Sequence, residues 1–150
     1  MDIDERIEPL VRAALGAAIK QDVDRLDAAL TAFPDDAARR KGLELAVAIS
    51  GFALFDMYGG KPWAKQVREA ASAIAQLAQW LGVTADEANA YFTSLVEGAP
   101  LESALDAEAA VPVIFVITAT LLAASPRVGQ DEWWFNYLDR IEAQLEAAAP

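Results

Sequence analysis

Two stretches of this chain, residues 43–58 and 109–124, are apolar on nearly every face that a helix could present. A helix of this kind is stable in water only when other helices cover it. The first stretch contains Glu44 and Asp56, the second contains Pro112, and neither reaches the ~20 uninterrupted apolar residues that cross a bilayer. We therefore predict two buried central helices, at about 43–58 and 111–124, and no membrane-spanning segment.

The other segments show the one-sided apolar pattern expected of covering helices. The clearest pattern follows alternating steps of four and three residues: Trp63, Val67, Ala70, Ile74, Leu77 and Leu81. No segment alternates apolar and polar residues over the length of a strand. We expect an all-α fold, a compact multi-helix bundle of about six or seven helices that forms a single domain over residues 1–150.

Local signals predict where the helices begin and end. Side chains that can accept hydrogen bonds from a first helical turn precede three of them: Asp22, Thr84 and Asp131. We place the first helix within residues 3–20, with a short helical piece at 101–108. Gly59 is expected to stop the first central helix, and Pro62 to open the next one.

The two halves of the chain repeat one order of elements. An apolar helix, a Gly/Pro loop and a Trp-led amphipathic helix occur at residues 43–81 and again at 111–145. A duplicated helical unit is one hypothesis. Alanine-rich sequences also produce such a likeness by chance, so that alternative stays open.

The chain is acidic, with a net charge of -11, and the charge is uneven. Residues 83–150 hold eleven Asp and Glu against Arg127 and Arg140. A field of this sign opposes phosphate backbones and anionic membranes, so we expect no nucleic-acid or membrane partner. The basic run 39–41 follows Asp35 and Asp36 at helical spacing, which favours a solvated helix face. A protein partner with a basic surface fits best.

Histidine and cysteine are both absent. Their absence excludes an imidazole base, a thiol nucleophile, a disulfide and the usual zinc sites. We assign no catalytic residue, metal ligand or cofactor. The acidic N-terminal residues lack the basic and apolar parts of an export signal, which indicates a cytoplasmic protein.

One enzyme hypothesis remains, and it uses carboxylates. An acid-Arg-aliphatic-acid tetrad occurs at residues 5–8, 24–27 and 139–142. Acids three residues apart share a helix face, so two facing tetrads could hold Mg²⁺ for phosphohydrolysis. The alternative is a set of ordinary surface ion pairs.

Asp56 lies near the end of an apolar helix, where its carboxylate either reaches water or is buried with a partner.

Aromatic residues suggest a binding surface. Trp133, Tyr137 and Arg140 form a stripe on the last helix, and Trp80 lies beside another stripe, whereas Trp63 and Trp134 are predicted to be core residues. Exposed Trp, Tyr and Arg would form a partner-binding patch, and the alternative is that they are edges of the bundle.

We therefore expect a non-enzymatic protein-protein interaction or regulatory domain, with homodimer formation as one form of the interaction. A small apolar ligand bound between the two central helices is an alternative. Small or polar residues at that position would line its site: Ser50, Gly51, Thr118 and Thr120. The Mg²⁺-dependent phosphohydrolase is the second alternative.

Overall fold

A computed structural model describes residues 1–98, 107–125 and 132–148, and this part of the chain is helical without strands. The prediction of an all-α fold is therefore confirmed. The described residues form seven α-helices and one 3₁₀ turn, in order: α1 (Glu8–Ile19), α2 (Val23–Thr31), α3 (Asp36–Tyr58), α4 (Ala64–Leu77), η1 (Gln79–Leu81), α5 (Ala85–Glu97), α6 (Ala107–Ala124) and α7 (Trp134–Ala147). None of the described helices combines the length and hydropathy of a membrane-spanning segment.

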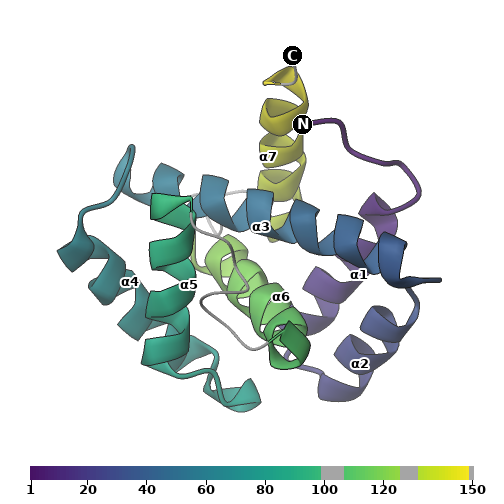
Figure 1. The fold of residues 1–150 in the computed structure, drawn as a ribbon, viewed down its shortest axis with the longest axis horizontal. Coiled ribbons are helices and arrows are strands. Elements are labelled where there is room, and N and C mark those ends of the chain that lie inside the picture. The colour runs from purple at the N-terminus through teal and green to yellow at the C-terminus, as the bar shows by residue number, and fades with distance from the viewer. Residues whose placement is uncertain (99–106, 126–131, 149–150) are drawn as a thin grey trace.

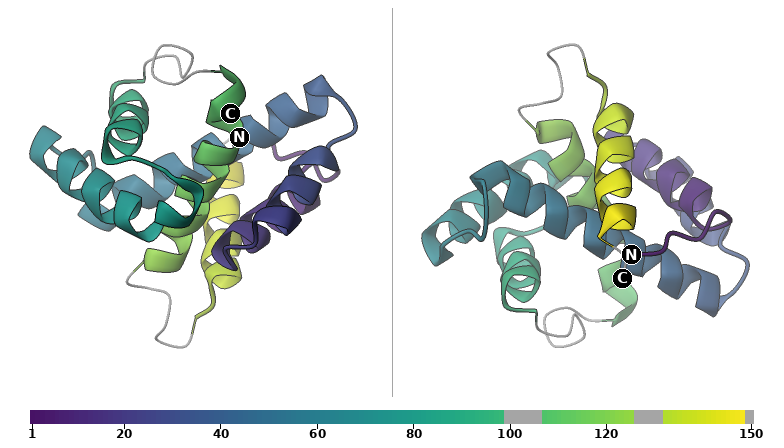
Figure 2. Two further views of the ribbon diagram at one scale, coloured as in Figure 1. Left: turned by 90° about the horizontal axis from the view of Figure 1, so that it is seen from below. Right: turned by 90° about the horizontal axis from the view of Figure 1, so that it is seen from above.

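Helices α3 and α6 cross at the centre of the molecule and pack against each other (Figure 1). The α1–α2 pair lies at one end and the α4–α5 pair at the other, which the views of Figure 2 also show. Helix α7 packs across both α3 and α6. The two predicted central helices therefore occupy the centre, and the amphipathic helices surround them.

Burial differs between the two central helices. In the middle of helix α6 the side chains from Val113 to Ala119 are all buried. Helix α3 buries one side, including Ile49 and Leu54, and leaves its other side half-buried. The half-buried side of α3 is where a groove forms, as described below.

The polar side chains between the central helices have hydrogen-bond partners. The Ser50 hydroxyl bonds the Tyr91 hydroxyl and the carbonyl of Val47. The Thr118 hydroxyl lies 2.7 Å from the Ile114 carbonyl of its own helix and 3.3 Å from the Ala46 carbonyl of α3. Burial raises the pKa of Tyr91, although the hydrogen bond with Ser50 acts in the opposite direction. These buried hydroxyls fasten helices to one another, since a buried polar group without a partner costs stability.

Several helix ends lie where the local signals predict them. Asp22 Oδ1 accepts a 3.0 Å hydrogen bond from the Arg25 amide at the start of α2. Thr84 and Glu87 bond each other's backbone N–H in a capping box that opens α5. Gly59 ends α3 with a left-handed φ of 69°, a conformation that glycine adopts without a Cβ clash.

The first helix, Glu8–Ile19, lies within the predicted range 3–20 and has Pro9 in its first turn, where proline needs no amide hydrogen bond. Other boundaries differ from the prediction. Helix α6 begins at Ala107, so Pro112 lies inside it and removes one backbone donor. The predicted cap Asp131 and most of the predicted piece 101–108 lie outside the described residues.

The predicted stripe of α4 differs from the buried face at two positions, Trp63 and Leu77. Helix α4 starts after Trp63, and the indole of Trp63 is 76% exposed instead of buried. At the other end Leu77 is also exposed, because the chain leaves the α-helix there and continues as η1. Periodicity identified the buried face between these ends, where Val67 and Ile74 are core residues.

Candidate functional site

The start of α7 carries a group of aromatic side chains in contact with one another. The rings of Trp133 and Phe135 stack with centroids 6.2 Å apart and planes 3° apart. Trp134 meets Phe135 edge-on, at 5.8 Å and 80°. Trp133 is 68% exposed and Phe135 39%, whereas Trp134 is partly buried. We call Trp133, Trp134 and Phe135 the α7 aromatic patch.

The local sequence fixes this patch in place. The Trp133 backbone N–H donates to Asn136 Oδ1 at 3.1 Å, which closes the first turn of α7. Trp134 is directed to the protein, where a Cβ on Gly16 would lie 3.5 Å from its ring. Successive helical residues point about 100° apart, so three adjacent aromatics cannot all be buried. Trp133 and Phe135 are consequently left towards solvent.

The four residues predicted to bind a partner do not form one surface. Tyr137 is buried, and its hydroxyl donates to Asp56 Oδ2 at 2.7 Å. Arg140 lies 5.5 Å from the centre of the Tyr137 ring and pairs with Glu132. Trp80 is partly buried against the core. Of the four, only Trp133 and Arg140 remain open to solvent, because α7 turns Tyr137 towards α3.

Asp56 falls between the two alternatives that the sequence left open, contact with water and burial with a partner. That carboxylate is half-buried and accepts the hydrogen bond of Tyr137, so it joins α3 to α7. It is therefore a partnered group in an interhelical contact.

Two of the three acid-Arg tetrads meet at a single guanidinium. Arg12 on α1 contacts Glu8 Oε1 at 2.7 Å, Asp139 Oδ1 at 2.7 Å and Glu142 Oε1 at 2.8 Å. We call these four residues the Arg12 cluster. It joins α1 to α7 across 127 residues of sequence.

The Arg12 cluster has more carboxylates than cations. Burial, followed by the hydrogen bond and the negative charge of Glu8, raises the pKa of Glu142 to about 8. The charge of Arg12 acts in the opposite direction. One carboxyl therefore keeps its proton near neutral pH, which reduces the repulsion among three acids.

The acids of the tetrads do not form a metal site. Arg12 occupies the point on which Glu8, Asp139 and Glu142 converge. The third tetrad lies on α2, where Asp24 and Asp27 are exposed. Among the described residues no three acids are arranged to hold a metal ion.

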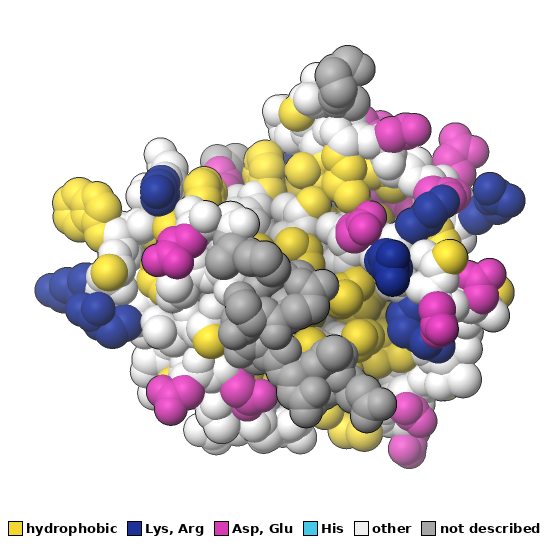
Figure 3. All heavy atoms as spheres, in the orientation of Figure 1, with side chains coloured by type: hydrophobic (Ala, Val, Ile, Leu, Met, Phe, Trp, Pro, Cys, Tyr) yellow, Lys and Arg dark blue, Asp and Glu magenta, His cyan; other side chains and the backbone are white. Residues whose placement is uncertain are grey.

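A groove of about 590 Å³ runs along the half-buried side of α3. Gly51, Phe52 and Phe55 line it from α3, and Leu95 and Leu145 line it from neighbouring helices. We call it the Gly51 groove. Figure 3 shows apolar side chains open to solvent along α3. Of the residues predicted to surround an apolar ligand, Gly51 lies in this groove, whereas Ser50 and Thr118 are packed inside.

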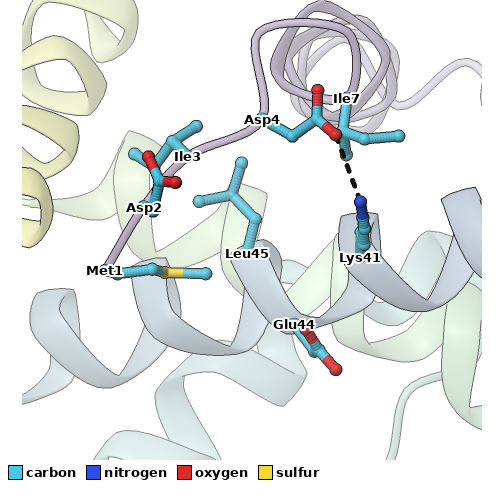
Figure 4. A pocket seen from close by; sticks show the side chains of 8 residues that line it. All are labelled: Met1, Asp2, Ile3, Asp4, Ile7, Lys41, Glu44 and Leu45. Carbon is cyan, nitrogen blue, oxygen red and sulfur yellow. Dashed lines mark hydrogen bonds and ion pairs between the residues drawn. The ribbon is translucent and has the colours of Figure 1, made fainter.

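A smaller pocket of about 270 Å³ lies under the N-terminal residues (Figure 4). The Lys41 ammonium pairs with Asp4 Oδ2 at 3.3 Å, and Glu44 points away from the other labelled side chains. The Met1 backbone nitrogen donates to the Leu145 carbonyl of α7. These polar groups hold the N-terminal segment across α3, and they are already engaged with one another.

No protein-family model matches the chain, and searches against curated proteins and solved structures found no match.

The candidate residue that the sequence pattern missed is Phe135, which follows Trp133 by two positions and so falls outside a stripe of three- and four-residue steps. The run of three adjacent aromatics was the signal that could have indicated it.

Proposed function

We propose that this domain is a non-enzymatic protein-binding domain and that the α7 aromatic patch is its contact surface. The observation that carries the proposal is the stacked pair Trp133 and Phe135, which is exposed whereas other aromatic side chains, such as Phe92, are buried in the core. Exposed aromatic side chains fixed by packing are the residue types that dominate binding energy in protein interfaces.

Charge indicates the kind of partner. Glu132 lies next to the patch in sequence, and Asp139 and Glu146 are exposed further along α7. Only Arg140 offsets them on this helix. A partner with an apolar contact point inside a basic rim complements this surface, and the attraction would weaken as salt is added.

A second copy of the chain is the first partner to test. Each copy carries a net charge of -11, so repulsion opposes self-association and added salt strengthens it. Sedimentation velocity over a concentration series at low and high salt measures both effects. If the chain forms a dimer through this patch, Trp133→Ala should weaken the dimer and Trp63→Ala should leave it unchanged, since Trp63 is also exposed but precedes α4.

A strict monomer at all concentrations would remove the homodimer and leave a different protein as partner. A photo-crosslinking residue at position 135 in cell extract then tests that partner, with the same residue at exposed position 77 as control. Crosslinks that appear at 135, disappear with Trp133→Ala and are absent at 77 support the proposal. Equal labelling at both positions would reject it.

An apolar ligand in the Gly51 groove is a second candidate function. The groove has the volume of a small-molecule site and aromatic side chains on its wall. Native mass spectrometry of freshly purified protein should then show an added mass. Gly51→Leu, which fills the groove, should remove that mass, and retention of the mass would place the ligand elsewhere.

A further inference from the structure

A third hollow, separate from the α7 aromatic patch and the Gly51 groove, lies between α4 and α5. It has a volume of about 660 Å³, within the usual range for small-molecule sites. Its wall includes two cations, an indole and an amide: Lys61, Arg68, Trp63 and Asn89. We call it the α4–α5 groove, and it shares no lining residue with the other two surfaces.

The indole of Trp63 forms an exposed wall at the start of α4. The Trp63 backbone N–H donates to Gln66 Oε1 at 2.9 Å, and the preceding Pro62 is buried, so the backbone at this residue is held. The side chain itself is 76% exposed. An indole face in a groove offers a surface on which a planar ring can stack.

Asn89 lines this groove and carries a buried acceptor without a hydrogen-bond partner. Its Oδ1 is the one buried side-chain oxygen or nitrogen in the described part of the chain that has no hydrogen-bond partner. Buried polar atoms are nearly always paired, so each exception calls for a physical reason. A ligand that donates an N–H or O–H to this oxygen would satisfy it.

The side chains that line the groove are more basic than acidic, although the protein as a whole is acidic. Lys61 and Arg68 line it against one acid, Glu97. Figure 3 shows basic side chains at the α4 end of the molecule, beside an exposed apolar side chain. Since the whole chain carries a net charge of -11, this local reversal of sign favours an anionic group.

We propose that the α4–α5 groove binds a small anionic ligand that carries a planar ring and a hydrogen-bond donor. The ring stacks on Trp63, the donor bonds Asn89 Oδ1, and a carboxylate or phosphate pairs with Lys61 and Arg68. Arg68 suits either anion, because a guanidinium bonds both in a bidentate manner.

Isothermal titration calorimetry tests the proposal with three probes. Indole-3-acetate carries the ring, the N–H and a carboxylate, and adenosine monophosphate carries the ring, donors and a phosphate. Tryptamine carries the same ring and N–H as indole-3-acetate with a positive charge. We expect at least one of the two anions to bind and tryptamine to bind about tenfold more weakly, because Lys61 and Arg68 repel it. If neither anion binds, or if tryptamine binds equally well, the proposal is wrong.

Matched variants locate the binding. Trp63→Ala and Asn89→Leu should each lower the affinity for the anion about tenfold, because the first removes the stacking surface and the second the hydrogen-bond acceptor. Trp133→Ala, another exposed tryptophan, and Lys65→Gln, an exposed lysine outside the groove lining, should leave its affinity unchanged. Without ligand, Asn89→Leu should melt no lower than the parent, since it removes an unpaired polar atom. Arg68→Gln, at an exposed position, removes one of the two cations and should also weaken binding of the anion. If both Trp63→Ala and Arg68→Gln leave the affinity for the anion unchanged, the proposal is wrong.

Discussion

The hydroxyl of Tyr137 donates a 2.7 Å hydrogen bond to Asp56 Oδ2, so one side chain of α7 reaches the last turn of α3. Tyr137 is buried and Asp56 is half-buried. Hydrogen bonds to charged acceptors are stronger than those between neutral groups. This contact, together with the Arg12 cluster, fixes the position of α7 and hence that of the aromatic patch at its start.

Tyr137→Phe should lower the free energy of unfolding by about 1–2 kcal/mol, because it removes a hydrogen bond to a carboxylate that water replaces only in part. Tyr58→Phe is the matched control, since the Tyr58 hydroxyl donates to a neutral carbonyl, that of Gln66, at 3.1 Å. Urea denaturation measures both variants. A loss for Tyr58→Phe as large as that for Tyr137→Phe would show that the carboxylate adds nothing.

The raised pKa of Glu142 predicts a fall in stability with rising pH. The folded state holds this proton up to about pH 8, whereas an unperturbed Glu releases it near 4.5. Between these values the unfolded state binds fewer protons, so the free energy of unfolding decreases as the pH rises through this window. Groups of α1 and α7 face this carboxyl: Glu8, Arg12 and Asp139.

Glu142→Gln should remove this part of the pH dependence, because glutamine resembles the protonated acid and does not titrate. Denaturation midpoints from pH 5 to pH 9 should decline less in the variant than in the parent. Glu146→Gln, at an exposed position on the same helix, should keep the decline of the parent. Parallel curves for Glu142→Gln and the parent would show that the proton is not held at this residue.

Arg12→Met tests the cation at the centre of the Arg12 cluster. Methionine keeps part of the apolar stem but leaves three acidic side chains without their cation, so the free energy of unfolding should fall by about 1–2 kcal/mol. The loss is smaller than for a fully buried pair because the Arg12 side chain is 31% exposed. The loss should be larger at pH 8 than at pH 5, where Glu142 is protonated and carries no negative charge. Arg39→Met breaks an exposed pair with Asp36 and should cost under about 0.5 kcal/mol. A pH-independent loss for Arg12→Met would contradict the prediction.

The sequence predicted those features that depend on nearby residues. The caps at Asp22 and Thr84 and the stop at Gly59 involve partners within a few positions, and all three are confirmed. The exposure of Trp63 was missed, since a periodic stripe gives the buried face of a helix but not the residue at which the helix begins.

The candidate sites depend on contacts between distant segments, which a single sequence does not reveal. The pattern marked the tetrads at 5–8 and 139–142, yet nothing in it named Arg12 as their shared partner, 127 residues from Asp139. The stripe through Tyr137 was visible, but its direction depended on how α7 packs on α3. Asn89 carried no signal, because an amide becomes notable only when its surroundings leave it unpaired.

Replacing two glycines of α3 with alanine should change the free energy of unfolding in opposite directions. A Cβ on Gly42 would lie 2.5 Å from Cε1 of Phe33, whose buried ring packs near Phe115. A Cβ on Gly51 would lie 4.0 Å from Leu95, which is ordinary contact. Alanine is favoured over glycine inside a helix by about 1 kcal/mol, so Gly51→Ala should raise the free energy of unfolding by up to this amount.

Gly42→Ala should instead lower the free energy of unfolding by about 1–2 kcal/mol, because overpacking a core outweighs the gain in helix propensity. Phe33→Leu in the Gly42→Ala background provides the control. If the clash with the ring causes the loss, the double variant should be more stable than the sum of the two single effects, as residues in contact are non-additive. Additive losses would mean that the cost of Gly42→Ala arises elsewhere in the packing of α3.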